Sequence, residues 1–441
     1  DIEIMKEHDE HEYDLEEVII KDRYKFVSNL LKGVVHQIPG YKSMTDRIDK
    51  IMLNKYLGLP IFGIVMALVF YMTFSIGSIF VDYVDYFFSE IVAGGVSSLF
   101  AAYGVADWLQ NLVVDGIIGG VGGVLTFLPT IAILFAFISL LEDLGYMGRA
   151  AYLMDKWMQR VGMNGKFFIP MLLGFGCNVP AIMSTRTLEN EKDRLIAILI
   201  NPFMSCGAKF PVYVLFVGVF FKGYEALTML SLYLLGIIVA VIVAYIFRKT
   251  IFKGEETHLI MEIPDYRLPR LSNLLIHIWE RVKDYLVKAG TVIFAASVIL
   301  WFLLNYNFSG GVDIVNSFGA GIGKAIAPIF GLAGFGNWQS SLSLLAGLFA
   351  KEIVVANTAI IYGLGETASL SQLGSVLGQA FTPVSAYAFL VFILLYTPCV
   401  ATIGVIKRET NSWKWAGFSV AYQFVIALGL STLIYQIGSL F

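Results

Sequence analysis

The sequence predicts an all-α polytopic membrane protein of two related halves, with about 8–10 membrane segments that include broken or re-entrant helices. Three observations predict this class. Of the 441 residues, 57% are hydrophobic and only 15% are charged, whereas soluble chains average about 25% charged. Apolar runs long enough to cross a bilayer core, about 20 residues each, recur along the chain. Two further apolar runs contain prolines or charges, and irregular backbone at membrane depth survives only where protein or a watery cavity satisfies it.

Residues 1–56 are predicted to form a cytoplasmic spacer with an interfacial helix. Apolar residues from Leu15 to Val35 recur at helical spacing, with basic residues between them. This pattern fits an amphipathic helix on the cytoplasmic leaflet, and it fits equally a helix packed on a soluble neighbour domain. The acidic start lacks the apolar region of a signal peptide. We therefore expect the first membrane segment to act as its own insertion signal.

The first membrane half is predicted at 57–247. Its continuous apolar runs lie at 58–80, 117–141, 194–221 and 225–247. Lys and Arg are absent from 56–148, so the loop between the first two runs is expected outside by the positive-inside rule. An interrupted run at 166–184 contains Pro170, Gly174, Gly176 and Pro180. Such interruptions are typical of broken or re-entrant helices.

A basic cytoplasmic loop at 248–285 separates this half from the second, predicted at 286–441. The second half has apolar runs at 286–306, 385–406 and 415–438, and an interrupted run at 341–363 that contains Lys351 and Glu352. Its only basic residues between 289 and 406 are Lys324 and Lys351. The loops there are therefore expected outside.

The two halves share a weak internal similarity around polar positions. Cys177 and Cys206 in the first half are matched by Lys351 and Cys399 in the second, at similar but unequal separations. Duplicated membrane halves usually place the substrate site at their interface, near the middle of the membrane. The pattern therefore predicts a site between the halves.

The three cysteines, Cys177, Cys206 and Cys399, are too few and too scattered for a disulfide framework. Each lies close to a proline, which frees the helix carbonyl four residues earlier, so the backbone is expected to open beside each thiol. An open carbonyl and a polarisable sulfur together suit a partly dehydrated, borderline divalent metal ion. The alternative is that the thiols are small packing residues. Thiol catalysis is disfavoured because no histidine lies in the apolar runs to activate a nucleophile.

Acidic and basic residues inside apolar runs are further candidates, because burying an ionisable group in a membrane is costly. Glu352 is predicted as a cation ligand, and Lys351 as a gating residue that repels the ion. The alternative for both is a structural ion pair between helices. Glu142 ends the run at 117–141. It is either a pathway carboxylate or the cytoplasmic border of a helix.

Several functions are excluded or disfavoured by the sequence. The net charge of −3, with its charges clustered, argues against nucleic-acid binding. The phosphate-loop pattern G-x-x-x-x-G-K-[ST] and the zinc motif H-E-x-x-H are absent from the sequence. We therefore do not expect this chain to be an enzyme.

Several runs resemble the permease part of ferrous iron transport protein B (FeoB). The most specific are G-F-G-C-N-V-P-A at 174–181 and N-P-F-M-S-C at 201–206. The runs S-M-T-D-R-I-D-K at 43–50 and L-L-E-D-L-G-Y-M-G-R at 140–149 are similar too, and the likeness extends from about Arg23 to the C-terminus. Departures include Gly207, Lys209 and Phe210, which replace the more usual Ser, Arg and Leu.

The resemblance implies two Gate domains, related to nucleoside-transporter-like folds, and Fe²⁺ as the transported substrate, with no covalently bound cofactor. It puts Cys177, Cys206 and Cys399 at the family's cysteine positions, and it implies a bacterial inner membrane with the N-terminus in the cytoplasm. The family's GTP-binding domain is not in this sequence, and we expect it to have been removed or to be a separate chain. A small cytoplasmic Feo protein, the lipid bilayer and a second copy of the chain are further expected partners.

Three alternatives to iron transport remain open at the level of sequence. Mn²⁺ or another divalent metal would use the same ligand types. A receptor or scaffold would use the polar membrane residues only to hold helices together and would carry no ion. A nucleoside carrier is conceivable by analogy of fold, although a fold alone does not set the substrate.

Overall fold

We analysed a computed structural model of the chain, which describes residues 15–31, 44–54, 56–126, 128–253, 265–267, 270–308, 310–311, 314–349, 351, 354, 361, 370–396 and 399–440. The chain divides into two compact units, Asp1–Asn54 and Lys55–Phe441. Glu352 and Pro398 lie outside the described residues, as does the end of the predicted interfacial helix beyond Leu31.

Among its described residues, the first unit contains two helices, α2 (Leu15–Leu31) and α3 (Met44–Met52). Helix α2 covers most of the predicted amphipathic segment, and apolar side chains such as Phe26 and Leu30 are exposed on it. In α3, Asp46 lies in the first turn and Lys50 in the last. Charges at these ends complement the helix dipole and favour a short helix.

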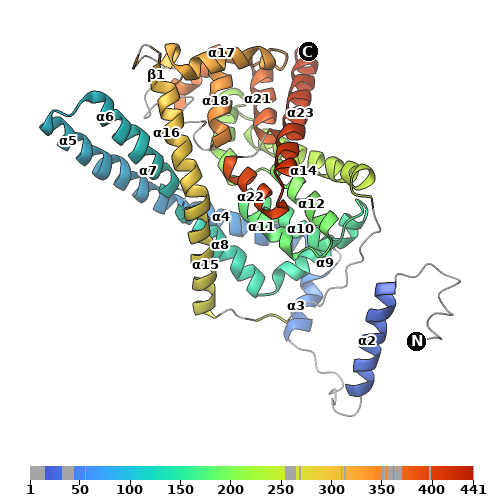
Figure 1. Cartoon of the computed structure of the whole chain (residues 1–441). Coiled ribbons are helices and arrows are strands. Elements are labelled where there is room, and N and C mark those ends of the chain that lie inside the picture. The colour runs from blue at the N-terminus through green and yellow to red at the C-terminus, as the bar shows by residue number, and fades with distance from the viewer. Residues whose placement is uncertain are drawn as a thin grey trace. The chain divides into compact units, whose positions relative to one another are not determined.

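The first half of the second unit is a succession of helices, drawn from blue to green in Figure 1. Figure 1 labels α-helices and strands. In the text, η denotes a short 3₁₀- or π-helical segment. The elements are α4 (Gly58–Tyr86), η1 (Phe87–Ala93), α5 (Gly94–Tyr103), α6 (Asp107–Asn111), η2 (Leu112–Ile118), α7 (Gly119–Thr126), α8 (Leu128–Asp143), α9 (Tyr146–Gln159), η3 (Gly165–Phe167), α10 (Phe168–Gly174), α11 (Asn178–Ser184), η4 (Thr185–Thr187), α12 (Glu191–Ile200), η5 (Asn201–Phe203), η6 (Gly207–Lys209), α13 (Phe210–Phe220) and α14 (Glu225–Thr250).

The second half continues from yellow to red in Figure 1. Its short strands β1 and β2 pair in an antiparallel hairpin. The elements are α15 (Leu271–Tyr285), η7 (Leu286–Gly290), α16 (Thr291–Asn305), β1 (Tyr306–Asn307), β2 (Gly310–Gly311), η8 (Ile314–Asn316), α17 (Phe318–Gly331), α18 (Trp338–Phe349), α20 (Leu370–Ala380), α21 (Pro383–Leu395), α22 (Val400–Thr410) and α23 (Trp413–Gly438).

The predicted helical membrane class is confirmed. Among the described residues, five helical stretches are long and apolar enough to cross a membrane, and a sixth is possible if the bent pair of α8 and α9 forms one span. That pair bends by 79° at Gly145, whose φ of 75° is left-handed and is readily adopted only by residues such as glycine. The five stretches are Gly58–Tyr103, Glu191–Phe220, Glu225–Thr250, Pro383–Thr410 and Trp413–Gly438.

One feature differs from the sequence-based expectations, and two interruptions agree with them. The expected long loop after the first run is instead helical, because apolar residues continue to Tyr103, and the chain turns at Gly104 with a φ of 63°. The apolar runs at 194–221 and 385–406 are interrupted beside Cys206 and Cys399, as the prolines near these cysteines predicted. A count of apolar residues does not detect these interruptions, since the flanking helices are as apolar as a straight span.

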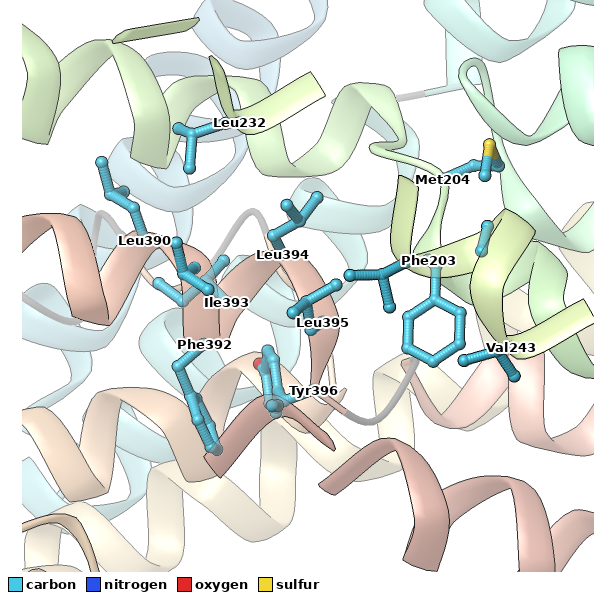
Figure 2. Packing of buried hydrophobic residues seen from close by; sticks show 14 of the residues in the cluster. Phe203, Met204, Leu232, Val243, Leu390, Phe392, Ile393, Leu394, Leu395 and Tyr396 are labelled. Carbon is cyan, nitrogen blue, oxygen red and sulfur yellow. The ribbon is translucent and has the colours of Figure 1, made fainter. Parts of the chain in front are cut away.

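The largest hydrophobic core is built around α21. All of its residues from Ala388 to Leu395 are buried, and a helix that is apolar on every side belongs in an interior. It contacts α13, α14 and α23. Figure 2 shows its last turn, with Leu394, Leu395 and Tyr396, in the same cluster as Phe203 of η5. The C-terminal end of α21, in the second half, therefore packs against η5, which belongs to the interrupted segment of the first half.

Candidate ion pathway at three broken helices

The first break separates α10 from α11 at Phe175–Cys177. Cys177 precedes the first residue of α11 and has extended backbone, with φ −152° and ψ 131°. Pro180 is the third residue of α11, where a missing N–H is tolerated because the first turn's N–H groups have no acceptor within the helix. The sequence therefore opens the helix at this cysteine, as predicted from the proline.

The glycines of this run allow close approach by other segments. A Cβ atom on Gly174 would lie 2.8 Å from Asn201 Oδ1, and one on Gly176 would lie 2.6 Å from Leu134 Cδ2. Contacts that short are not tolerated by a side chain of any size. Glycine at both positions lets the break pack directly on α8 and on η5.

The second break, Met204–Cys206, lies between η5 and η6, which continues into α13. It is joined to the first break by a backbone hydrogen bond, in which the Gly207 N–H donates to the Gly176 carbonyl over 3.1 Å. That is the carbonyl which Pro180 was expected to release from the helix. The release is observed, but the carbonyl is taken by the neighbouring break, so the two cysteine segments are held side by side.

The third break separates α21 from α22, and Cys399 directly precedes α22. The Cys399 Sγ atom lies 3.2 Å from Thr402 Oγ1 in the first turn of that helix. All three cysteines thus occupy the position just before a helical turn, in extended backbone. Cysteine binds a metal through its deprotonated sulfur.

Two buried lysines, one from each half, meet the end of α21. The Lys209 ammonium donates to the Leu394 carbonyl over 2.7 Å, and Lys351 donates to the Ile393 carbonyl over 3.4 Å. Lys351 also lies over the Tyr396 ring, with its nitrogen 4.1 Å from the ring centre. The last carbonyls of a helix have no partner within it, so the lysines satisfy groups that the third break leaves open.

Two family models and several known proteins match this chain. A family model described as Gate, nucleoside recognition, matches residues 124–220 and 286–413, and one described as ferrous iron transport protein B C terminus matches 229–281. The protein named Fe(2+) transporter FeoB from Staphylococcus aureus strain COL is 47% identical over 95% of this chain and 63% of its own length. This chain belongs to the FeoB family.

Two further relatives extend the FeoB comparison. The Fe(2+) transporter FeoB of Methanocaldococcus jannaschii is 42% identical, covering 96% of this chain and 63% of the relative. A Porphyromonas gingivalis protein named as a fusion of Fe(2+) transport protein A and FeoB is 38% identical, and the match covers 99% of this chain and 57% of the relative. The chain thus spans somewhat under two thirds of the length of these relatives. No solved structure matches it.

The Gate matches of the FeoB family enclose the breaks. The range 124–220 contains Cys177 and Cys206, and the range 286–413 contains Lys351 and Cys399. Cys206 and Cys399, one from each Gate range, both interact electrostatically with Lys209. Within the part of the chain that the structure describes, no three side chains of His, Cys, Asp or Glu gather to hold a metal.

The acidic candidates are placed differently from the cysteines. Glu142 is exposed in the last turn of α8. Leu134 of the same helix lies against the first break, and Glu142 is about 12 Å further along the helix axis. Among the described residues no metal-ligand group includes it, and its role as a pathway carboxylate stays a prediction. Glu352 lies outside the described residues, and its predicted role stays a prediction.

Sequence reasoning missed three sets of polar residues near the FeoB breaks. Lys209 is fully buried. Its charge within an apolar run was the feature of the sequence that could have identified it as a candidate. Asn178 and Asn201 are buried, and within the described residues their Oδ1 atoms accept no hydrogen bond. The third set centres on Glu409, whose buried carboxylate pairs with Arg186 over 2.7 Å and with Arg194 over 3.1 Å.

Proposed function

We propose that this chain is the ion-conducting part of a ferrous iron transporter of the inner membrane, with its N-terminus in the cytoplasm. Fe²⁺ is the transported substrate in this proposal. The observation that carries it is the arrangement of three cysteines at helix breaks, two of them joined by the hydrogen bond from Gly207 to Gly176. The names of the relatives, which are Fe(2+) transporters, support the choice of metal.

The proposed chemistry is partial replacement of the ion's water shell. Cysteine sulfur and carbonyl oxygen are both present at the breaks, and their combination favours borderline divalent ions over Mg²⁺ and Ca²⁺. The second and third breaks approach each other through Lys209, which contacts the last turn of α21. An ion passing between the halves would therefore meet Cys206 and Cys399 from opposite Gate ranges. Glu142 and Glu352 are proposed as further stations on its path.

The chain is proposed to act as a transporter and not as an enzyme. Nucleotide hydrolysis is assigned to a GTP-binding domain, supplied by a longer form of the protein or by another chain. A small protein similar to Fe(2+) transport protein A is a further proposed partner, because one relative is named as a fusion with it. These partners would act from the cytoplasmic side, where the first unit and the loop at 248–285 are expected.

Iron flux into proteoliposomes tests the proposal. The double variant Cys177→Ser and Cys206→Ser is expected to lose at least tenfold in the initial rate of Fe²⁺ uptake, because serine offers no soft sulfur ligand. A matched control is Met158→Leu with Met163→Leu, which removes two buried sulfur atoms from the core and should leave the uptake rate unchanged. Unaltered uptake and metal selectivity in the cysteine variant would refute the ligand role.

Transport of another divalent metal is the second candidate, favoured by the same ligand set. Competition by Mn²⁺ for radioactive Fe²⁺ uptake separates the two. Iron transport predicts that excess Mn²⁺ inhibits weakly, whereas a manganese transporter would be inhibited at equimolar Mn²⁺. A scaffold would show no uptake of either ion, and uridine uptake without metal uptake would indicate a nucleoside carrier.

A further inference from the structure

The Lys209 ammonium is enclosed by backbone carbonyls. Its side chain is fully buried, and its nitrogen lies 3.3 Å from the Pro202 oxygen, 3.3 Å from the Met204 oxygen and 2.7 Å from the Leu394 oxygen. Figure 2 shows Met204 and Leu394 on the two segments that supply these oxygens. A charge buried this deeply is stable only when its hydrogen-bond donors are all occupied in this way.

These carbonyls have the properties of a cation site. Pro202 and Met204 flank the end of η5 at the second break, and Leu394 is in the last turn of α21 at the third. Carbonyls at the ends of helical segments carry the negative end of the helix dipole. Rings of backbone carbonyls replace the water shell of cations in ion-selective filters. The protein's own ammonium therefore fills a cage that is also suited to a dehydrated metal ion.

The cage lies beside two of the cysteines. Cys206 and Cys399 interact electrostatically with both Lys209 and Tyr396. The backbone N–H of Lys209 donates a hydrogen bond to the Cys206 carbonyl over 3.0 Å. A divalent ion bound to these thiolates would be close to the ammonium and repelled by it. The ion and the ammonium therefore compete for the same space and the same negative groups.

We propose that the Lys209 ammonium is a tethered competitor of the transported cation. Without an ion, it bridges the carbonyls of the two halves at Met204 and Leu394 and holds the cage closed. A divalent ion enters only by displacing it, which frees the second and third breaks to separate. The inference rests on the proposed function, since it requires that the chain bind a divalent cation.

Mn²⁺ binding to the detergent-solubilised chain, measured by titration calorimetry, tests this competition. Lys209→Met keeps the length of the side chain and removes the charge, so it should bind Mn²⁺ at least tenfold more tightly, which corresponds to about 1.4 kcal/mol. Lys209→Arg keeps the charge and should bind as the unaltered chain does. The matched control is Lys324→Met, which removes a charge from an exposed lysine and should leave the affinity unchanged.

A second measurement uses the unaltered protein and so does not depend on how the variants fold. Acetic anhydride acetylates amines that reach water, and mass spectrometry measures the extent at each lysine. Lys209 should be protected in the presence of a chelator and should become reactive at saturating Mn²⁺, whereas exposed Lys324 should react equally in both. A lysine that only caps α21 would be protected in both conditions.

The outcomes separate this inference from the proposed function. If the unaltered chain binds neither Mn²⁺ nor Fe²⁺, the proposed function fails and the inference fails with it. If the chain binds Mn²⁺ but Lys209 stays protected, or if folded Lys209→Met binds Mn²⁺ no more tightly, the inference alone is overturned.

Discussion

At the scale of single residues, the breaks depend on what glycine and cysteine each allow. Glycines at 174 and 176 let the first break lie against Asn201 and Leu134, and the cysteine that follows takes the extended backbone that begins α11. These requirements are local, so the G-F-G-C run with Pro180 was enough to predict an opening at Cys177. What the opened carbonyl of Gly176 contacts was not predictable, because its donor, Gly207, lies in another segment.

Adding a methyl group at Gly174 tests the close approach of the first break. Gly174→Ala places a Cβ 2.8 Å from both Asn201 Oδ1 and Met204 Cβ, and overpacking of this kind costs about 1–3 kcal/mol. We expect a lower thermal unfolding midpoint in detergent and a reduced rate of Fe²⁺ uptake. Gly218→Ala is the control, because nothing lies within 4 Å of its added Cβ and alanine favours helix α13. Equal midpoints for the two variants would contradict the packing that we describe.

At the scale of elements, the two halves are joined through pairs of helices that are distant in sequence. Lys209 of η6 reaches α21, and Glu409 of α22 pairs with Arg186 of η4 and Arg194 of α12. Hydrophobic periodicity identifies each of these helices but does not say which of them meet. For that reason the apolar runs at 194–221 and 385–406 gave no indication of their mutual contact, although the prolines near their cysteines indicated where each run would open.

The Glu409 cluster predicts a measurable link between the halves. Glu409→Gln removes the acceptor of a bidentate arginine pair, and the loss of charged hydrogen bonds should cost roughly 2 kcal/mol, less than for a fully buried pair because Arg186 is partly exposed. The unfolding midpoint in detergent should fall accordingly. Glu189→Gln breaks an ion pair whose carboxylate is 85% exposed, so it should change stability by less than about 1 kcal/mol. A larger fall for Glu189→Gln than for Glu409→Gln would exclude the link.

At the scale of the whole molecule, the chain is a multi-pass membrane protein of the FeoB family whose long helices are interrupted where polar chemistry is needed. Composition alone predicted the membrane class, because a charged fraction of 15% cannot cover a soluble protein of this length. The orientation of the segments rests on the distribution of Lys and Arg and stays a prediction. The three cysteines at the breaks were identifiable in the sequence, and their role as metal ligands stays a prediction. The carbonyl cage around Lys209 was not predictable, since its oxygens come from residues far apart in the chain.

Accessibility from each side of the membrane tests the orientation. Tyr103 is 82% exposed beside the turn at Gly104, within the stretch that lacks basic residues. Glu189 is exposed in the charged segment at 186–194, which lies in the cytoplasm if the run at 166–184 is re-entrant and does not cross the membrane. A membrane-impermeant maleimide added to intact cells should label Tyr103→Cys and leave Glu189→Cys unlabelled. Cells carrying only the native cysteines give the background. The reverse pattern would invert the topology.

The central claim is that cysteine sulfur at the helix breaks binds the transported iron. X-ray absorption at the iron edge, recorded on the chain loaded anaerobically with Fe²⁺, measures this directly because sulfur and oxygen neighbours scatter differently. We predict sulfur among the atoms bound to iron in the unaltered protein, and its loss when Cys177, Cys206 and Cys399 are all replaced by serine. Iron surrounded only by oxygen and nitrogen in the unaltered protein would contradict the account.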